Sequence, residues 1–395
     1  MLEIRLISMP CAEIDWASLA LAQLEQALLD RFQSSIHVEV FYLNHDFVAL
    51  LGMEAYHDLL SWGGKSSSGL ELDNISISVK EWIFRRAAFP QAVENGKEFL
   101  QGYLHMSDNM YQRILDIESR VPSILSIILN QYHLSQVNVV CFTSMFDQNL
   151  ASLAMARLIK QINASVVTIM GGPNCNYPAG AEMSENVPYL DWAISGCGLT
   201  ALPKLIECLL MDKHQLADQI PGVFSFRNRE KMERDGTLLG ESSGVYSHIH
   251  LNYDHFFSSL TSKLPDIKHM PILFFETSRG CWWGERSRCT FCDVNQWEKK
   301  YQTLEPRKAI AMLRELFHYK DICKMFWAVD SVFPLSYLDS VFPILTQEMQ
   351  NCNVFYEIRV DMTPYDLKRM WKYNIRYIQA GVEALSDHLL HLMNK

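Results

Sequence analysis

Short apolar runs alternate with helical patterns along most of this chain, and this alternation constrains the fold more than any other feature. Five runs in the first half have the composition of β-strands: residues 2–8, 36–43, 137–144, 165–172 and 190–198. Helical patterns follow three of them, at residues 17–31, 149–162 and 202–210. Apolar strands that alternate with helices predict a parallel sheet with helices on both faces. We therefore expect an α/β fold.

The second half carries its own block of strands and helices. Its expected strands are residues 272–278, 324–330, 354–360 and 375–383. Its expected helices are residues 305–319, 336–350, 364–373 and 385–395. Four consecutive strand–helix units favour a barrel or half-barrel. Four strands do not close a barrel, and an exposed parallel edge is a liability. We therefore expect a partial barrel, either truncated at the C-terminus or covered by another element.

The chain is expected to divide into three segments. Residues 1–225 would form the first α/β domain, with a helical insertion at about 45–130 that has a soft break at GGKSSSG, residues 63–69. Residues 226–265 are expected as a linker, continuing a β-excursion that begins near residue 220. Residues 266–395 would form the second domain. A length of 395 residues fits two domains.

Composition bears on location and partners. The net charge of −10 argues against a bulk nucleic-acid or anionic-membrane surface. The sequence contains no apolar run of about 18 residues, which a transmembrane helix would need. The opening MLEIRLISMPCAEIDW does not have the pattern of a signal peptide. We expect a cytoplasmic protein that binds neither nucleic acid nor membrane. Its ten cysteines should be reduced thiols, metal ligands or catalytic groups.

Three of the cysteines cluster on one loop, in the sequence RGCWWGERSRCTFCDVN. Cys281, Cys289 and Cys292 have the spacing C-x7-C-x2-C, directly after the first strand of the second domain. Three thiolates on one loop can hold three irons of a cubane cluster and leave the fourth iron free for a substrate. Phe291, between the last two cysteines, would shield the metal. Trp282 and Trp283 are expected to pack around the cluster.

Two other interpretations of the cysteines stay open. A structural zinc site usually shows two pairs of ligands, and here only one C-x2-C pair exists. His318 or Cys323 would have to be recruited as further ligands, although both lie on or after a helix. Ordinary free thiols are the second alternative, but three cysteines within twelve residues, beside Gly280 and Gly284, are an improbable accident.

At this loop the sequence resembles a known family. TSRGCWWGERSRCTFCDVN is similar to the cluster loop of the radical S-adenosylmethionine enzymes that mature ribosomally made peptides (RiPPs). The segments ISMP, FTSMFDQNLASLAMA, IMGGPNCNYPAG and DWAISGCG resemble the Rossmann-like cobalamin-binding domain that precedes the radical domain in that family. The resemblance implies a TIM-like radical domain in the second half. It also implies three cofactors, namely a [4Fe-4S] cluster, S-adenosylmethionine and cobalamin.

The resemblance assigns residues of the second domain to S-adenosylmethionine. They lie in the cysteine loop or at the ends of three expected strands: Phe291, Asp330, Ser331, Glu357, Arg359, Gln379, Gly381 and Glu383. Glu357 and Arg359 alternate on one strand and point to the same side, so an interior ion pair is an equal alternative for them. Glu383 is an alternative cap for a helix that starts near Ser386. No catalytic side chain is assigned beyond the cofactors.

The resemblance assigns residues of the first domain to cobalamin. They follow the expected strands, where open α/β sheets bind ligands: Ser8, Met9, Pro10, Thr143, Ser144, Gln148, Gly171, Gly172, Gly196 and Gly198. The D-x-H-x-x-G element that supplies a histidine to cobalt in some cobalamin proteins is absent. Binding would therefore lack a protein histidine beneath the metal. A purely structural domain is the alternative.

The implied activity is methylation of an unactivated carbon of a precursor peptide by a cobalamin-dependent radical methyltransferase. The implied partners are the peptide and an electron donor of the flavodoxin or ferredoxin type. One alternative is a cobalamin-containing radical enzyme that epimerises, rearranges or cyclises a peptide. The other is a truncated, non-catalytic fragment that binds the cofactor or the peptide.

Overall fold

The computed structural model of the chain describes residues 1–61, 79–242, 244, 250–268, 270–292 and 300–395. The chain divides into two compact units. The first unit contains residues 1–14, 28–241 and 254–266, and the second contains residues 15–27, 242–253 and 267–395. Each unit has its own sheet and its own buried core, and each is described by itself below.

The first unit is built on a six-stranded sheet with the order β2-β1-β3-β4-β5-β6. Its strands are β1 (Leu2–Ser8), β2 (Ile36–Tyr42), β3 (Val139–Thr143), β4 (Val167–Gly171), β5 (Trp192–Ile194) and β6 (Val223–Phe224). The first five run parallel to their neighbours, and β6 pairs antiparallel with β5. The parallel α/β sheet expected from the alternation of apolar runs and helices is confirmed.

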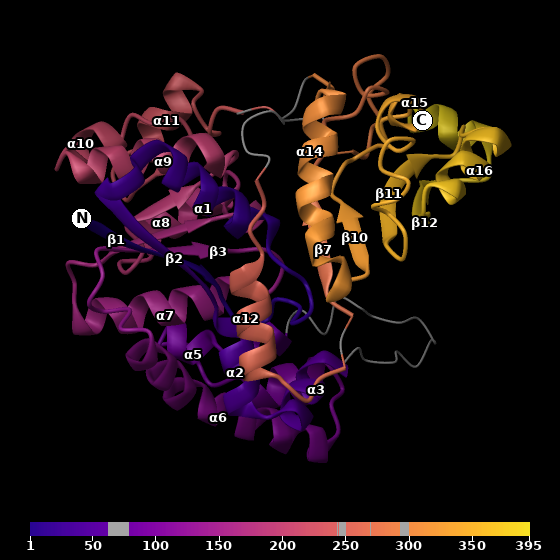
Figure 1. Cartoon of the computed structure of the whole chain (residues 1–395). Coiled ribbons are helices and arrows are strands. Elements are labelled where there is room, and N and C mark those ends of the chain that lie inside the picture. The colour runs from indigo at the N-terminus through magenta and orange to yellow at the C-terminus, as the bar shows by residue number, and fades with distance from the viewer. Residues whose placement is uncertain (62–78, 243, 245–249, 269, 293–299) are drawn as a thin grey trace. The chain divides into compact units, whose positions relative to one another are not determined.

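Helices cover both faces of this sheet, with α7 and α5 on one side and α9 on the other (Figure 1). The helices before and after β3 are α2 (Leu43–Leu51), α3 (Met53–Ser61), α5 (Arg85–Ala88), the π-helix η2 (Lys97–Tyr103), α6 (Asp108–Gln131) and α7 (Asn149–Ile162). Those after β4 are the 3-10 helix η3 (Pro173–Cys175), α8 (Ala179–Asn186), α9 (Gly198–Leu210) and α10 (His214–Ala217). Helices α2, α3, α5, η2 and α6 lie in the range of the expected helical insertion, and the expected break at 63–69 lies outside the described residues.

The expected linker at residues 226–265 contains two helices instead. Helix α11 (Arg229–Asp235) follows β6 and ends at Gly236, whose φ of 68° suits the left-handed cap of a helix. Helix α12 (Asp254–Lys263) buries Phe256, Phe257 and Leu260 within the first unit. In α12 the buried residues Phe256, Phe257 and Leu260 have helical spacing, whereas α11 has one apolar residue, Met232, and therefore no apolar pattern that predicts a helix.

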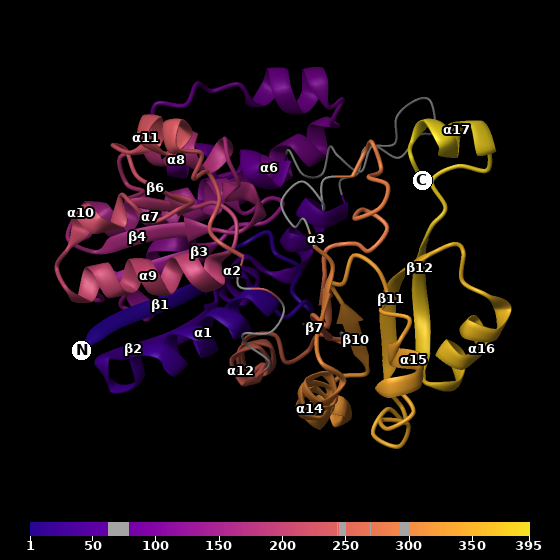
Figure 2. The ribbon, with the colours of Figure 1, turned by 90° about the horizontal axis from the view of Figure 1, so that it is seen from above.

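The second unit contains a parallel four-stranded sheet with the order β12-β11-β10-β7 (Figure 2). Its strands are β7 (Ile272–Phe275), β10 (Met325–Ala328), β11 (Asn353–Arg359) and β12 (Ile375–Gly381). The helices are α14 (Pro306–Leu316), the 3-10 helix η4 (Phe317–Asp321), α15 (Tyr337–Ser340), α16 (Pro364–Lys372) and α17 (Asp387–Leu392). Helix α1 (Leu19–Phe32) has residues in both units.

One helix of this unit is much shorter than expected. A helix was predicted at residues 336–350, but α15 ends at Ser340 and turns follow it. Pro343 explains the difference, because proline has no N–H to donate and its ring clashes with the carbonyl of the residue four positions earlier. The backbone after the helix uses three-residue turns, such as the N–H of Ile344 donating to the carbonyl of Val341 at 3.1 Å.

An early part of the chain completes the core of this unit. The N–H of Ala17 donates to the carbonyl of Ile272 at 3.1 Å. The indole of Trp16 packs edge-on against Phe274 with ring centroids 5.4 Å apart, and lies 5.8 Å from the ring of Trp327. These contacts cover part of β7, the strand that leads into the cysteine loop, whose Ile272 and Phe274 are half-buried.

Candidate functional site

The cysteine loop is closed at its base by a small antiparallel ladder. Strand β8 (Ser278–Arg279) pairs with β9 (Gln302–Thr303), so the loop leaves and returns at one place. Gly280 follows β8 with a φ of 79°, and a Cβ there would lie 2.8 Å from the carbonyl oxygen of Lys300. Only glycine fits this position without strain.

The three cysteines of the loop are half-buried. The N–H of Cys292 donates to the carbonyl of Cys289 at 3.3 Å. Desolvation raises the pKa of Cys289, the neighbouring Cys292 and Cys281 raise it further, and the cations Lys395 and Arg359 oppose this. The three thiols therefore lie close enough to influence one another, which fits the thiolate donors of an iron–sulfur cluster. Over the described part of the chain, no three His, Cys, Asp or Glu side chains are already arranged around a metal position.

The extra ligands of the zinc alternative lie elsewhere. Cys323 is buried, and its thiol contacts the carbonyls of Pro271 and Met325 at 3.0 and 3.2 Å. His318 lies in η4 at the end of α14. Among the described residues of the loop, three thiols without a fourth ligand fit a cluster better than a closed zinc site.

Asp330, which follows β10, is completely buried. One carboxylate oxygen accepts the N–H of Thr277 at 2.7 Å, and the other accepts the hydroxyls of Thr277 and Ser278 at 2.5 and 2.8 Å. Burial raises the pKa of Asp330 to about 7, although these hydrogen bonds oppose the shift. Asp330 therefore ties β10 to the residues that lead into the cysteine loop, and its neighbour Ser331 is half-buried.

The sequence did not indicate the partners of Asp330. Thr277 and Ser278 precede it by 53 and 52 residues, and isolated hydroxyl residues carry no motif. The hydroxyl of Thr277 also lies 3.1 Å from that of Tyr356 on β11, so the network reaches a third strand.

The remaining residues predicted to bind S-adenosylmethionine lie on adjacent strands or near the cysteines. In the parallel register of β11 and β12, Glu357 faces Gln379 and Arg359 faces Gly381. Arg359 pairs with Asp361 at 3.2 Å rather than with Glu357. The structure thus places the residue pairs Glu357–Gln379 and Arg359–Gly381 side by side, toward the carboxyl ends of β11 and β12. The ring of Phe291 is 51% exposed.

Glu383 has a role other than capping α17. Its carboxylate pairs with the ammonium of Lys395 at 2.8 Å. The hydroxyl of Ser386 caps the helix by accepting the N–H of Leu389 at 3.4 Å. Residues after α17 contact the cysteine loop, where the N–H of Thr290 donates to the carbonyl of Met393 at 3.0 Å.

In the first unit, the order of the parallel strands reverses between β1 and β3. Such a switch point is where open α/β sheets bind ligands. In the aligned register, Ser8 faces Thr143, and Thr143 faces Gly171 on β4. Gln148 bridges the loops by donating its amide to the carbonyl of Met9 at 2.8 Å. The predicted cobalamin residues of three loops therefore gather at this edge.

Several of these residues are enclosed by protein. Ser8, Met9, Pro10, Ser144 and Gln148 are buried. Their polar groups hold the loops together, so contact with a ligand would come from the exposed backbone around them.

The predicted glycines lie along the same edge. Gly172 has a φ of 108°, and a Cβ there would lie 2.5 Å from the carbonyl oxygen of Ser144, so the β3 and β4 loops touch through it. The N–H of Gly196 donates to the side chain of Asn176 at 2.9 Å. Gly198 begins α9.

A half-buried acidic group at this edge was not indicated by the sequence. The carboxylate of Glu81 accepts the N–H groups of Asn149 and Leu150 at 2.9 and 2.7 Å, at the start of α7. Burial raises the pKa of Glu81 to about 7. Asp147 is also buried and pairs with Lys80 at 3.4 Å. The sequence around Glu81 does not indicate that its carboxylate caps the start of α7, because the two are far apart in the chain.

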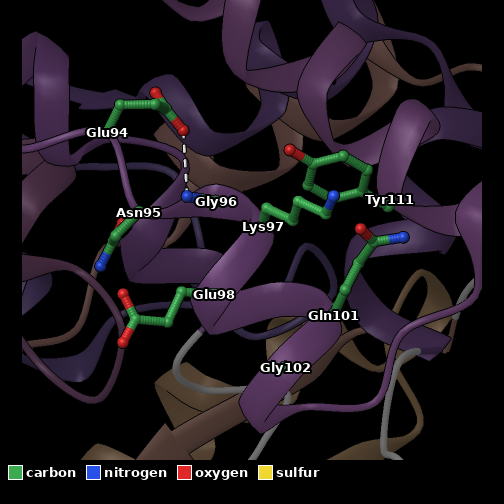
Figure 3. A pocket seen from close by; sticks show the side chains of 8 residues that line it. All are labelled: Glu94, Asn95, Gly96, Lys97, Glu98, Gln101, Gly102 and Tyr111. Atoms are coloured by element: carbon green, nitrogen blue, oxygen red, sulfur yellow. Dashed lines mark hydrogen bonds between the residues drawn. The ribbon is translucent and has the colours of Figure 1, made fainter.

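A separate hollow of about 680 Å³ lies in the insertion, beside the π-helix η2 (Figure 3). It contains none of the predicted site residues and is lined by eight others: Glu94, Asn95, Gly96, Lys97, Glu98, Gln101, Gly102 and Tyr111. The carboxylate of Glu94 accepts the N–H of Gly96 at 3.0 Å on one wall.

No protein-family model matches the chain. A curated relative, the "uncharacterized methyltransferase PH0819" of Pyrococcus horikoshii, is 21% identical over 277 residues, which is 68% of this chain and 56% of that protein. Two structures of the cobalamin-dependent S-adenosylmethionine radical enzyme OxsB match the whole chain at 14% identity. The form with aqua-cobalamin bound has a TM-score of 0.59, and the apo form has 0.57.

The chain spans about half the length of these proteins, namely 46% and 45% of the two OxsB chains. At this identity the likeness concerns the fold. The chain therefore has a mixed α/β fold with parallel sheets, similar to that of a cobalamin-dependent radical S-adenosylmethionine enzyme, together with a weak sequence relationship to a methyltransferase.

Proposed function

We propose that this chain belongs to a cobalamin-dependent radical S-adenosylmethionine enzyme that methylates an unactivated carbon of a ribosomally made precursor peptide. The observation that carries the proposal is the loop with Cys281, Cys289 and Cys292, which closes on itself at the carboxyl end of the first strand of a parallel sheet. The same chain carries a second parallel sheet with a switch point. The likeness of the whole chain to OxsB supports the pairing of these two sheets in one enzyme.

The three thiolates would hold three irons of a [4Fe-4S] cluster, because one C-x2-C pair and one distant cysteine on one loop offer three soft donors. When bound there, such a cluster supplies the electron that cleaves S-adenosylmethionine. The residues of the chain position the ligands and exclude water. Glu357 and Gln379, side by side on β11 and β12, offer an acceptor and an amide to the ligand's polar groups.

Cobalamin would lie at the β1/β3 switch point of the first unit. Gly172 and Gly196 let neighbouring loops pack closely at this edge, because a Cβ at either would lie within 3 Å of backbone atoms of another loop. The methyltransferase name of the Pyrococcus relative supports methylation over the other radical reactions. The peptide substrate and the flavodoxin or ferredoxin-type donor rest on the motif resemblance of the cysteine loop.

Among the described residues, none of the helices is both long and apolar enough to cross a bilayer. We place the enzyme in the cytoplasm, because its proposed cluster and its ten cysteines suit a reducing compartment.

The first test is anaerobic purification of the chain, reconstitution with iron and sulfide, and titration with cobalamin. We expect iron in proportion to the three cysteines, and cobalt bound with a changed optical spectrum. Iron without cobalt would remove methyl transfer and keep the radical chemistry. Cobalt without iron would contradict the assignment of the cysteine loop.

The second test uses the reconstituted full-length enzyme with a precursor peptide encoded beside its gene. We expect 5′-deoxyadenosine together with a peptide heavier by one methyl group. Formation of 5′-deoxyadenosine with an unchanged peptide mass would contradict methylation and favour epimerisation or rearrangement. A peptide that loses hydrogen would favour cyclisation.

A further inference from the structure

We infer that Trp283, assisted by Trp282, is a positioning residue that holds the guanidinium of Arg359 beside the cysteine loop. The inference rests on the proposed function, since it gives the arginine a role toward the proposed cluster. It assigns the WW pair of the loop a specific electrostatic task, in place of general packing around the metal.

The geometry of the stack carries the inference. The guanidinium carbon of Arg359 lies 4.2 Å from the ring centroid of Trp283 and 5.2 Å from that of Trp282. The two indoles are nearly perpendicular, at 87°, with centroids 6.1 Å apart. One arginine thus contacts both rings. An arginine over a tryptophan face is the strongest common form of cation–π contact.

A carboxylate fixes the other side of the guanidinium. The Nε of Arg359 lies 3.2 Å from both oxygens of Asp361. The arginine side chain is only 15% exposed. Two aromatic faces and one carboxylate therefore restrict a side chain that would otherwise sample many rotamers, and the planar guanidinium suits both kinds of contact.

The restrained charge acts on the loop. Arg359 contacts the rings of Trp282 and Trp283, which directly follow Cys281 in the chain, so its charge lies beside the start of the cysteine loop. Arg359 also ends β11 and faces Gly381 in register, and it therefore stands at the strand edge toward which the loop folds. A fixed positive charge beside thiolate ligands stabilises the more negative, reduced form of a cluster.

Arg286 does not duplicate this arrangement. It belongs to the loop itself, is exposed, and lies 5.8 Å from the ring of Trp282. A solvated cation is screened, whereas a half-buried one is screened much less. Arg359 is therefore the cation through which the tryptophans would act.

The experiment is a redox titration of the reconstituted chain with dithionite, which adds one electron per cluster, followed by electron paramagnetic resonance. R359Q should lower the ratio of reduced to oxidised cluster about tenfold at a fixed applied potential. For a one-electron couple this corresponds to a reduction potential lower by about 59 mV. W283L should shift the ratio in the same direction by about fivefold, because loss of the aromatic face frees the arginine. W283F should recover part of the shift. Iron content and thermal stability are measured for each variant.

W371L is the matched control. Trp371 on α16 stacks on Arg376 with 3.8 Å between the guanidinium carbon and the ring centroid, and it is 63% exposed. The same chemical change there should leave the cluster potential unaltered. The double variant W283L/R359Q should have the potential of R359Q alone, since Trp283 acts through the arginine.

The outcomes separate the two proposals. A wild-type chain that takes up no iron overturns the proposed function and this inference together. A wild-type chain with a reducible cluster, combined with W283L at an unchanged potential, overturns the inference alone. Additive shifts in the double variant would show that Trp283 acts on the cluster by a route other than Arg359, and would also overturn it.

Discussion

Replacement of Asp330 by asparagine should change how the stability of the second unit depends on pH. Burial raises the pKa of Asp330 from 3.8 to about 7. One pKa unit corresponds to about 1.4 kcal/mol, so the shift is worth about 4 kcal/mol in total. The folded state binds this proton more tightly than the unfolded state does. Between these two pKa values the free energy of unfolding therefore falls as the pH rises, by up to about 1.4 kcal/mol per pH unit.

Asparagine suits this site, which makes the variant a test of charge rather than of packing. Its carbonyl oxygen can accept the N–H of Thr277, as one carboxylate oxygen does now. Its amide can donate to the hydroxyls of Thr277 and Ser278. Those hydroxyls can then donate to Tyr356, 3.1 Å away, and to the carbonyl of Val332, 3.3 Å away. The network keeps its geometry and loses its titratable proton.

The assay is urea denaturation monitored by pulsed hydrogen exchange of peptides from β7 and β10, which report on this unit rather than on the whole chain. At about pH 5.5 D330N should already be more stable than the wild type, and between about pH 5.5 and pH 7 that margin should grow by about 2 kcal/mol, because only the wild type loses stability as the pH rises. D339N removes an exposed carboxylate of the same unit and controls for net charge. A margin that is constant over this pH range would refute the argument.

Three further outcomes are expected. C281A should abolish iron binding, and C352A, which removes a buried thiol outside the loop, should retain it, as measured by iron content after reconstitution. G172A should weaken cobalamin binding at least about tenfold in an optical titration, because the new Cβ would lie 2.5 Å from a backbone carbonyl. The control G52A, where φ is also positive but nothing lies within 4 Å, should not. Burial raises the pKa of Glu81 to about 7, so the wild type should lose stability as the pH rises toward that value. E81Q should remove this loss, as measured by hydrogen exchange of α7.

The residue ranges of the strands could be predicted because each strand has its own local pattern of apolar residues. The sheet edge at which the strands end follows from their parallel order. Residues 2–8 were expected as a strand, and β1 is Leu2–Ser8; residues 149–162 were expected as a helix, and α7 is Asn149–Ile162. In a parallel sheet the carboxyl ends of successive strands meet at one edge. Residues after β1 and β3 could therefore be assigned to one site without knowledge of their contacts.

Contacts between distant positions could not be predicted in this way. Asp330 was expected to face a ligand, because it ends a strand. Its partners Thr277 and Ser278 are more than 50 residues away, and only the completed sheet places them beside it. Glu81 is similar, since its bond to the start of α7 spans 68 residues. Helix ends have free N–H groups, and which carboxylate reaches them is decided by tertiary packing.

These long-range contacts have a common effect on the cysteine loop. The loop is long, and its ends are fixed by the β8 and β9 ladder, by the Asp330 network beneath β8, and by Gly280 at the turn. Its first part is held against β11 by the contact of Trp283 with Arg359. Because the two anchors use different chemistry, D330N should change the pH dependence of stability at the base of the loop and leave the cluster potential unchanged, whereas W283L should do the reverse. The arrangement of the three thiols therefore depends on two separate sets of contacts, and the spacing of the cysteines alone does not determine it.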